Sequence, residues 1–303
     1  MNKNKNSLEA NNRKSVAITA VIFLLPVILF LAVYVLYPII DTFVISTYKW
    51  NGISANRDFV GLKNWKRLLE DTKFWAAFWH NIVIMVVSVV IQIPLGLALA
   101  TFLNFFTKKV RISRVFKTVW FFPYLMSSVA IGFLFTYALA TNGGIISTIS
   151  GWFGGQNIDL LGNPKTALLT IILIVSWQFT PFYMVYCMAG YSGISDDIYE
   201  ASVIDGATRG QYFWKVALPL LKPSLISAAI LSMVGSLKYF DLIYVMTNGG
   251  PGSSTELMAT YMYKFSFSQF NMGYGSTVAG GMFILITAVA LLTMKGLNRG
   301  GEE

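Results

Sequence analysis

The chain has 303 residues, of which 55% are hydrophobic and only 12% are charged. Soluble domains carry about 25% charged residues, so this chain has too few to cover a surface that faces water. Its formal net charge of +9 does not indicate a nucleic-acid partner, because the basic residues stand in short runs between apolar stretches. The single cysteine and single histidine exclude an intrachain disulfide and a site of several histidines. Composition therefore predicts a membrane protein and argues against metal catalysis.

Six stretches of the chain are long and apolar enough to cross a bilayer as helices, which takes roughly 20 residues each. These stretches are 16–40, 81–105, 115–140, 167–190, 224–246 and 277–294. The first follows two basic residues, as a secretion signal does. It is longer than the apolar core of about 7–15 residues in such a signal, so we predict a retained helix. We expect the last helix to begin earlier than its apolar stretch, near Tyr274.

The distribution of basic residues predicts which connecting segments face the cytoplasm. With the N-terminus inside, most Lys and Arg fall on inner segments, and the run from Lys108 to Lys117 contains no acid. We therefore predict a multi-pass protein of a bacterial-type plasma membrane with both termini cytoplasmic. The predicted parts are an inner tail at 1–15, a first helix at 16–40, an extracytoplasmic loop at 41–80, a five-helix core at 81–295 with a cytoplasmic loop at 191–222, and an inner tail at 296–303. The four acids of the loop at 41–80 favour a small folded element over a linker.

The cytoplasmic loop carries the most informative pattern of the chain. Residues at helical spacing predict a short helix from Asp196 to Ala207, which Gly206 would end. They also predict a second helix from Thr208 to Ala217, which would meet Pro219. A short helix across the end of a bundle suits the docking of a soluble partner. A hairpin that only packs on the bundle fits the spacing at least as well, so both interpretations stay open at this point.

Eight residues of this loop resemble the EAA loop of ABC importer permeases: Glu200, Ala201, Asp205, Gly206, Ala207, Phe213, Leu218 and Pro219. Ser202 stands where that loop has its second alanine. The resemblance implies a coupling helix seated in a cleft of an ATPase subunit, formed by Glu200, Ala201, Asp205, Gly206 and Ala207. The chain has no GxxxxGK[ST] sequence. ATP and magnesium would therefore be bound by that partner, and this chain would hold no cofactor of its own.

A second string of residues narrows the resemblance to carbohydrate-type permeases, such as those of the maltose and glycerol-phosphate systems. It consists of Phe240, Asp241, Ile243, Thr247, Asn248, Gly249, Gly250, Pro251 and Thr255, and the pattern of 59–64, Phe74 and Asn81 agrees with it. The resemblance implies an all-α membrane protein with six transmembrane helices in a type I importer bundle. It implies import of a di- or oligosaccharide by alternating access, without enzymatic activity in this chain. The implied partners are a second homologous permease in a heterodimer, two ATPase subunits, an extracytoplasmic sugar-binding protein and membrane lipid, but no nucleic acid.

Aromatic and small polar residues inside the predicted helices are candidates for a substrate path, because sugars bind to aromatic faces and to hydroxyl or amide groups. The third predicted helix offers Tyr124 and Ser128, one turn apart. The resemblance implies a central cavity faced by Tyr124, Ser128, Trp177, Phe182, Ser236 and Tyr239. Phe179 stands where a small residue would let a sugar ring approach.

Lys238 and Asp241 are ionisable residues inside the predicted fifth helix, and such residues are functional candidates by default. At a spacing of i, i+3 they would share one helix face, where they could instead neutralise each other. An ion-gradient secondary transporter is the alternative function. The chain has no visible inverted repeat, and Asp241 is the only acid plainly within a helix, so this alternative is disfavoured. A membrane enzyme and a purely structural subunit are further alternatives.

Overall fold

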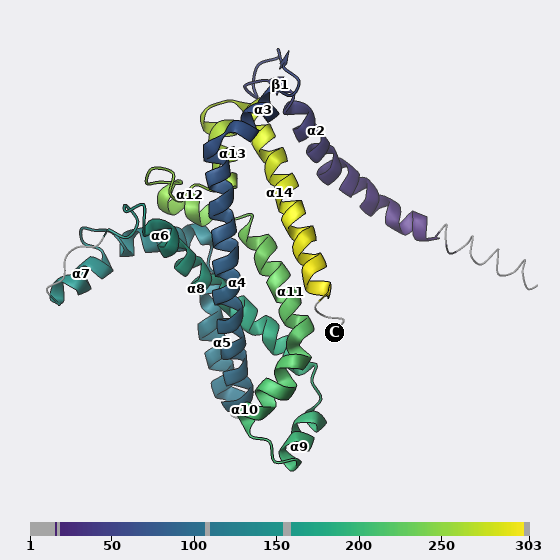
Figure 1. The fold of residues 1–303 in the computed structure, drawn as a ribbon, viewed down its shortest axis with the longest axis vertical. Coiled ribbons are helices and arrows are strands. Elements are labelled where there is room, and N and C mark those ends of the chain that lie inside the picture. Colours follow the sequence, from purple (N-terminus) through teal and green to yellow (C-terminus); the bar gives the residue numbers. More distant parts are fainter. Residues whose placement is uncertain (1–15, 17–18, 107–109, 154–158, 300–303) are drawn as a thin grey trace, which may run out of the picture. The chain divides into compact units, whose positions relative to one another are not determined.

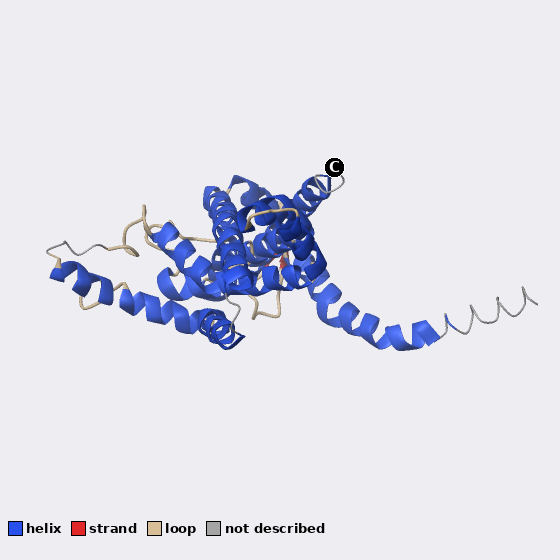
Figure 2. Cartoon of the chain, turned by 90° about the horizontal axis from the view of Figure 1, so that it is seen from below, coloured by secondary structure: helices blue, strands red, loops and turns tan. Residues whose placement is uncertain are grey.

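The computed structural model describes residues 16, 19–106, 110–153 and 159–299 of the chain. The predicted inner tail at 1–15, residues 300–303 of the other tail, and Lys108 and Lys109 lie outside the described residues. The described part is mostly helical, with one short hairpin of two strands (Figure 1, Figure 2). Contacts divide the chain into two compact units, Met1–Leu69 with Phe265–Gly280 and Glu70–Lys264 with Gly281–Glu303.

The first unit contains a membrane helix and a small folded segment that follows it. The helix runs from Thr19 to Ile45, includes the π-helical turn η1 (Ala32–Leu36) and ends as α2 (Tyr37–Ile45). The segment contains antiparallel strands β1 (Tyr48–Lys49) and β2 (Asp58–Phe59) and helix α3 (Lys63–Glu70). Asn64 Nδ2 donates to the carbonyl oxygens of Ser46 and Tyr48 at 2.9 and 3.0 Å. These bonds tie α3 to the end of α2, so the segment is a folded element rather than a linker, as predicted.

The second unit is built on three long helices that pack together. They are α4 (Thr72–Phe106), α8 (Ala167–Ser192) and α11 (Leu218–Ser236). Gly96 lets α4 approach α8 closely, because a Cβ atom at that position would lie 2.8 Å from the backbone nitrogen of Met184. Fully buried isoleucines fill the core of this unit, among them Ile84, Ile171 and Ile243.

The third predicted helix is not one straight span. Its residues form α5 (Val110–Leu125) and α6 (Ser128–Ala138), whose axes differ by 90°. Ser127 breaks the helical path with a ψ of 134°, and Pro123 near the end of α5 lacks the N–H that a continuing helix would use. The prediction of a continuous helix over 115–140 is therefore wrong. A short helix, α7 (Ile145–Trp152), follows α6.

The fifth predicted helix is shifted towards the N-terminus. A continuous helix runs from Arg209 to Ser236, comprising α10 (Arg209–Tyr212), the π-helical turn η2 (Phe213–Ala217) and α11. Pro219 therefore does not end the predicted helix at 208–217, because proline is accommodated in the first turn of α11 after a π-helical turn. At its other end, the helix stops at Ser236, and a separate helix α12 (Asp241–Thr247) follows. The predicted span 224–246 is thus wrong at both ends.

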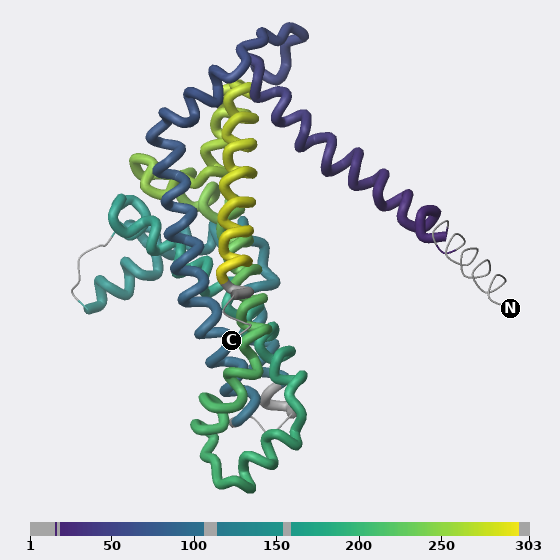
Figure 3. The backbone as a smooth tube through the Cα atoms, turned by 45° about the vertical axis from the view of Figure 1, so that its right-hand side comes forward, coloured from purple at the N-terminus to yellow at the C-terminus, as the bar shows by residue number. Residues whose placement is uncertain are grey.

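The chain ends with α13 (Met258–Tyr263), the π-helical turn η3 (Lys264–Ser268) and α14 (Met272–Arg299). α14 begins at Met272, close to the predicted start near Tyr274. Among the described residues, five helices are long and apolar enough to cross a membrane, and six segments qualify if the bent pair α5 and α6 counts as one. This number agrees with the six predicted passes. Figure 3 follows the chain through these helices from the N-terminus to the C-terminus.

Candidate functional site

The predicted coupling segment forms a short helix, α9 (Asp196–Ile204), between α8 and α10 (Figure 3). Ser195 caps the helix, since its Oγ accepts a hydrogen bond from the Asp197 backbone N–H at 3.3 Å. Asp196 and Asp197 lie in the first turn, where the helix dipole favours carboxylates. Gly206 follows the helix with a φ of 78°, in the left-handed region that glycine adopts at low cost. The predicted stop at Gly206 is therefore confirmed.

The residues that resemble the EAA motif lie on the surface of the second unit. Glu200, Ala201, Asp205 and Gly206 are exposed, and Ala207 is half-buried. Ile204 at the end of α9 is 85% exposed, which is unusual for a large apolar side chain. A Cβ atom at Gly206 would meet no other atom within 4 Å. The helix thus leaves both carboxylates and apolar groups exposed, and it does not bury them against the bundle.

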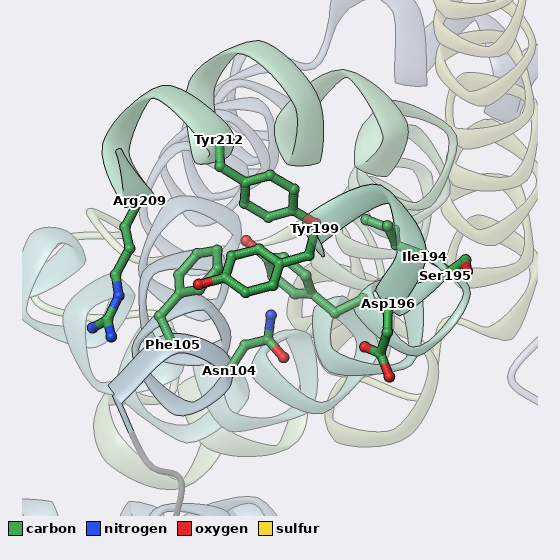
Figure 4. A pocket seen from close by; sticks show the side chains of 9 residues that line it. Asn104, Phe105, Ile194, Ser195, Asp196, Tyr199, Arg209 and Tyr212 are labelled. Carbon is green, nitrogen blue, oxygen red and sulfur yellow. The ribbon is translucent and has the colours of Figure 1, made fainter. Parts of the chain in front are cut away.

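An aromatic cluster holds α9 against the bundle. The ring of Tyr199 packs edge-on against Tyr212 at a centroid distance of 5.0 Å, and it contacts Phe105 at the end of α4 at 6.4 Å. Beside the cluster lies a pocket of about 240 Å³, with Arg209 and Asp196 on opposite sides (Figure 4). Sequence reasoning missed these aromatics. The signal was available, since Tyr199 lies inside the predicted helix.

The second motif of the sequence forms a tight loop after α12, which we call the Gly-Pro loop (residues 248–256). Asn248 and Gly249 both have positive φ angles, 48° and 81°, and the Gly250–Pro251 peptide bond is cis. Thr255 Oγ1 lies 2.7 Å from Thr247 Oγ1 and donates to the carbonyl oxygen of Gly250 at 2.7 Å. The threonines of the motif therefore close the loop on itself. A hollow of about 550 Å³ lies beside Gly250 and Pro251.

Three of the predicted path residues meet in a row of aromatic rings. Tyr124 of α5 stacks on Phe182 of α8 with a centroid distance of 5.3 Å. Phe179 contacts Tyr124 at 5.8 Å and Tyr239 at 5.6 Å. Phe179, which the sequence marked as an obstacle to a sugar ring, is thus the link that joins Tyr239 to the other two rings. Sequence reasoning did not find this role.

The other predicted residues of α5, α6 and α8 lie apart from this row. Ser128 begins α6, so it is separated from Tyr124 by the 90° bend, and the expectation that they lie one turn apart in one helix is wrong. The Ser128 hydroxyl accepts a hydrogen bond from Gln178 Nε2 at 3.2 Å. Trp177 is 42% exposed and packs on Phe135, on nearly the opposite side of α8 from Phe179. A contact of Trp177 with substrate stays a prediction.

Ser236 belongs to a buried polar group behind Tyr239. Ser236, Ser232 and Gln92 are each at most 2% exposed, and Ser232 Oγ donates to Gln92 Oε1 at 3.1 Å. Ser236 Oγ and Gln92 Nε2 have no hydrogen-bond partner among the described residues. Sequence reasoning missed Gln92, although a single amide inside an apolar stretch was a signal for it. Buried polar groups of this kind are available to bind hydroxyl groups or water.

Lys238 and Asp241 do not share a helix face. Lys238 lies in the break after α11, and Asp241 is the first residue of α12. Both are exposed, and no ion pair joins these two described residues. The predicted i, i+3 pair on the fifth helix is therefore wrong, and its physical reason is the helix break at 237–240. Within the described ranges, no group of three or more His, Cys, Asp or Glu residues is placed to hold a metal ion.

Comparison with known proteins identifies the class of this chain. Residues 92–300 match the family model of binding-protein-dependent transport system inner membrane components, so the chain belongs to that family. The probable ABC transporter permease protein YurN of Bacillus subtilis is 32% identical over 93% of this chain and 97% of its own length. The trehalose/maltose transport system permease protein MalF of Thermococcus litoralis is 32% identical over 90% and 92%, respectively. The lactose transport system permease protein LacF of Rhizobium radiobacter is 33% identical over 90% of each chain.

A solved structure supports the fold. A chain of a bacterial ABC transporter involved in the import of the acidic polysaccharide alginate superposes with a TM-score of 0.80, covering 97% of this chain and 99% of that one. The two chains are 19% identical, so this likeness concerns the fold alone. The chain is an all-α membrane protein with the type I importer permease fold, and the predicted fold class and family resemblance are confirmed.

Proposed function

We propose that this chain is the permease subunit of an ATP-binding-cassette importer and forms the translocation path for a di- or oligosaccharide. The observation that carries the proposal is α9, an exposed helix with the coupling motif on its surface, in a chain of a binding-protein-dependent transport family. The names of the relatives support a carbohydrate substrate, since they include permeases for trehalose/maltose and lactose. The row formed by Tyr124, Phe179, Phe182 and Tyr239 supports it independently, since aromatic faces bind sugar rings.

The proposed mechanism is alternating access. Two ATPase subunits bind ATP and magnesium and close on the coupling segment of each permease, which is Glu200–Ala207 in this chain. A second, homologous permease completes a heterodimer, and an extracytoplasmic binding protein delivers the sugar. ATP and the loaded binding protein drive the transition because each binds one of the two access states better than the other. This chain makes and breaks no bond, so it is a transport subunit and not an enzyme.

The proposed location is a bacterial-type plasma membrane with both termini in the cytoplasm. This orientation places α9 on the cytoplasmic side, where ATP is available. α9 and the Gly-Pro loop are tied to opposite ends of α4, since Phe105 contacts Tyr199, whereas His80 contacts Glu256. The same orientation therefore places the Gly-Pro loop on the outer side, where a binding protein arrives.

The test is purification of the native complex in mild detergent, followed by mass spectrometry of its partners and an assay of ATP hydrolysis. We expect a second six-helix permease, a P-loop ATPase and a binding protein to copurify, and we expect the binding protein with its sugar to stimulate hydrolysis. The binding protein can then be screened against di- and oligosaccharides. A chain that elutes alone, and whose uptake activity follows an ion gradient without ATP, would favour the secondary transporter instead.

A further inference from the structure

An ion pair with a buried carboxylate lies at the end of the Gly-Pro loop. The Glu256 side chain is 5% exposed, and its carboxylate pairs with the Lys264 ammonium, whose side chain is 28% exposed. Thr260 Oγ1 donates a further hydrogen bond to Glu256 Oε1 at 2.6 Å. Glu256 directly precedes the N-cap of α13, Thr260 lies in α13 and Lys264 begins η3, so the helical turns after Glu256 bring both partners back to its carboxylate. Burial of a charge is costly unless the charge is paired and hydrogen-bonded, and both conditions are met here.

The loop rests directly on this carboxylate. Gly249 has a φ of 81°, and a Cβ atom at that position would lie 2.5 Å from Glu256 Oε2. Only a glycine therefore lets the loop backbone pass so close to the carboxylate. The position of the carboxylate in turn defines how far the loop can approach the start of α13.

The residues around the pair are also tied to α4. The carbonyl oxygen of Glu256 lies 2.9 Å from His80 Nδ1. Two residues further on, the Met258 backbone N–H donates to Asn81 Oδ1 at 3.0 Å. The loop is thus attached to one of the long helices of the bundle through backbone groups. A change in the Glu256 side chain leaves these groups in place, so it would act on the loop rather than on α4.

We propose that Glu256 and Lys264 are positioning residues, which hold the Gly-Pro loop in the conformation that binds the extracytoplasmic binding protein. The proposal rests on the importer function proposed above. An ion pair is better explained by this positioning role than by a contribution to stability, because replacing a buried pair by apolar side chains is often neutral or stabilising. What the pair contributes is a defined geometry, with a carboxylate at one fixed place beneath Gly249.

The experiment uses the full transporter complex in lipid nanodiscs and the binding protein that copurifies with it. ATP hydrolysis is measured as a function of the binding-protein concentration, with its sugar at saturation. Glu256→Gln and Lys264→Met each remove one charge; the first keeps the side-chain length, and the second shortens the side chain by one atom. Gly249→Ala puts a side chain at a φ of 81° and a Cβ atom against the carboxylate, so it disturbs the contact from the loop side and leaves both charges in place. Glu70→Gln serves as the matched control, since Glu70 is an exposed acid at the end of α3.

We expect each of the three variants to raise the half-saturating binding-protein concentration about tenfold, the factor expected for a charge-assisted hydrogen bond. Basal hydrolysis and the recovery of the assembled complex should stay at the level of the wild type and of Glu70→Gln. The double variant Glu256→Gln/Lys264→Met should recover assembly if a single variant loses it, because no unpaired charge remains. It should still show the raised half-saturating concentration, because the fixed carboxylate is gone.

Two results would overturn the proposal. One is an unchanged half-saturating concentration in any variant that assembles. The other is a fall of basal and stimulated hydrolysis by the same factor, because that would make the pair merely structural. The proposed function fails separately, when the wild-type complex has no binding protein or shows no stimulation by it.

Discussion

The two motif-bearing segments of the second unit are built in opposite ways. α9 exposes its motif residues and contacts the rest of the unit through the aromatic ring of Tyr199. The Gly-Pro loop leads into a buried segment, where Leu257 and Met258 are fully buried and Asn81 and Glu256 hold polar contacts. The difference teaches that α9 leaves its motif residues free to contact a partner, whereas the Gly-Pro loop is held by contacts within its own unit. Substitutions in α9 should therefore change coupling, and substitutions in the buried segment that follows the Gly-Pro loop, or of its partner Asn81, should change stability.

The largest expected effect is the loss of stability in Asn81→Leu. Asn81 is fully buried, and its amide accepts from the Met258 N–H at 3.0 Å and donates to the Leu237 carbonyl at 3.3 Å. Leucine has a similar size but leaves both backbone groups without a partner, at a cost of about 2–4 kcal/mol in the free energy of unfolding. Thermal denaturation of the complex measures this loss. Asn142→Leu, at an exposed asparagine, should be close to neutral, and equal effects at the two sites would contradict the comparison.

Gly206→Val should uncouple transport without unfolding the bundle. The φ of 78° at this position costs a residue with a side chain about 1–2 kcal/mol, so the chain after α9 would leave its native path. We expect sugar uptake and stimulated hydrolysis to fall about tenfold, while the melting temperature changes little. Gly143→Val is the matched control, because Gly143 has the same φ of 78° and equally open surroundings. Full uptake in Gly206→Val would show that the coupling assignment is wrong.

The parts of the fold that hydropathy determines could be predicted from the sequence. Membrane helices need a long apolar stretch, and the described residues of four of the six stretches each lie in one continuous helix, whereas 115–140 and 224–246 are each divided between two helices. The helix breaks could not be predicted in this way. Pro94, Pro181 and Pro223 lie inside continuous helices, whereas the chain bends by 90° after Pro123. Proline removes one backbone donor at each site, so packing around the site decides whether the helix continues.

The candidate site was predictable where local backbone chemistry defines it. A glycine after a short periodic segment predicts a helix stop, and Gly206 provides it. The pairing of Glu256 with Lys264 and the contact between Phe179 and Tyr239 are different in kind. The first depends on α13 and η3, which the sequence pattern did not indicate. The second joins α8 to the break between α11 and α12, and only the folded bundle brings such residues together.

Tyr199→Ala should weaken coupling at most as much as Gly206→Val does. The tyrosine ring contacts Tyr212 and Phe105, and aromatic pairs contribute about 0.5–1.5 kcal/mol each beyond the area they bury. Without the ring, α9 loses its contact with the end of α4, and we expect the ratio of stimulated to basal hydrolysis to fall by a factor of about five to ten. Tyr199→Phe keeps the ring and should retain the ratio. A loss in both variants would show that the hydroxyl, and not the ring packing, carries the effect.

The smallest expected effect comes from Ser88→Ala. This variant tests whether buried polar groups stabilise the second unit only when they have a hydrogen-bond partner. Ser88 is fully buried in α4, and its hydroxyl has no hydrogen-bond partner among the described residues. A buried hydroxyl without a partner is destabilising, so its removal should leave the free energy of unfolding unchanged or raise it by less than about 1 kcal/mol. The melting temperature should accordingly stay the same or rise. Ser232→Ala is the matched control, because the equally buried Ser232 donates to Gln92 at 3.1 Å, and its loss should cost about 1 kcal/mol. A larger loss at Ser88 than at Ser232 would mean that the Ser88 hydroxyl binds a water molecule, so that buried polar contacts extend along α4 towards the path residues.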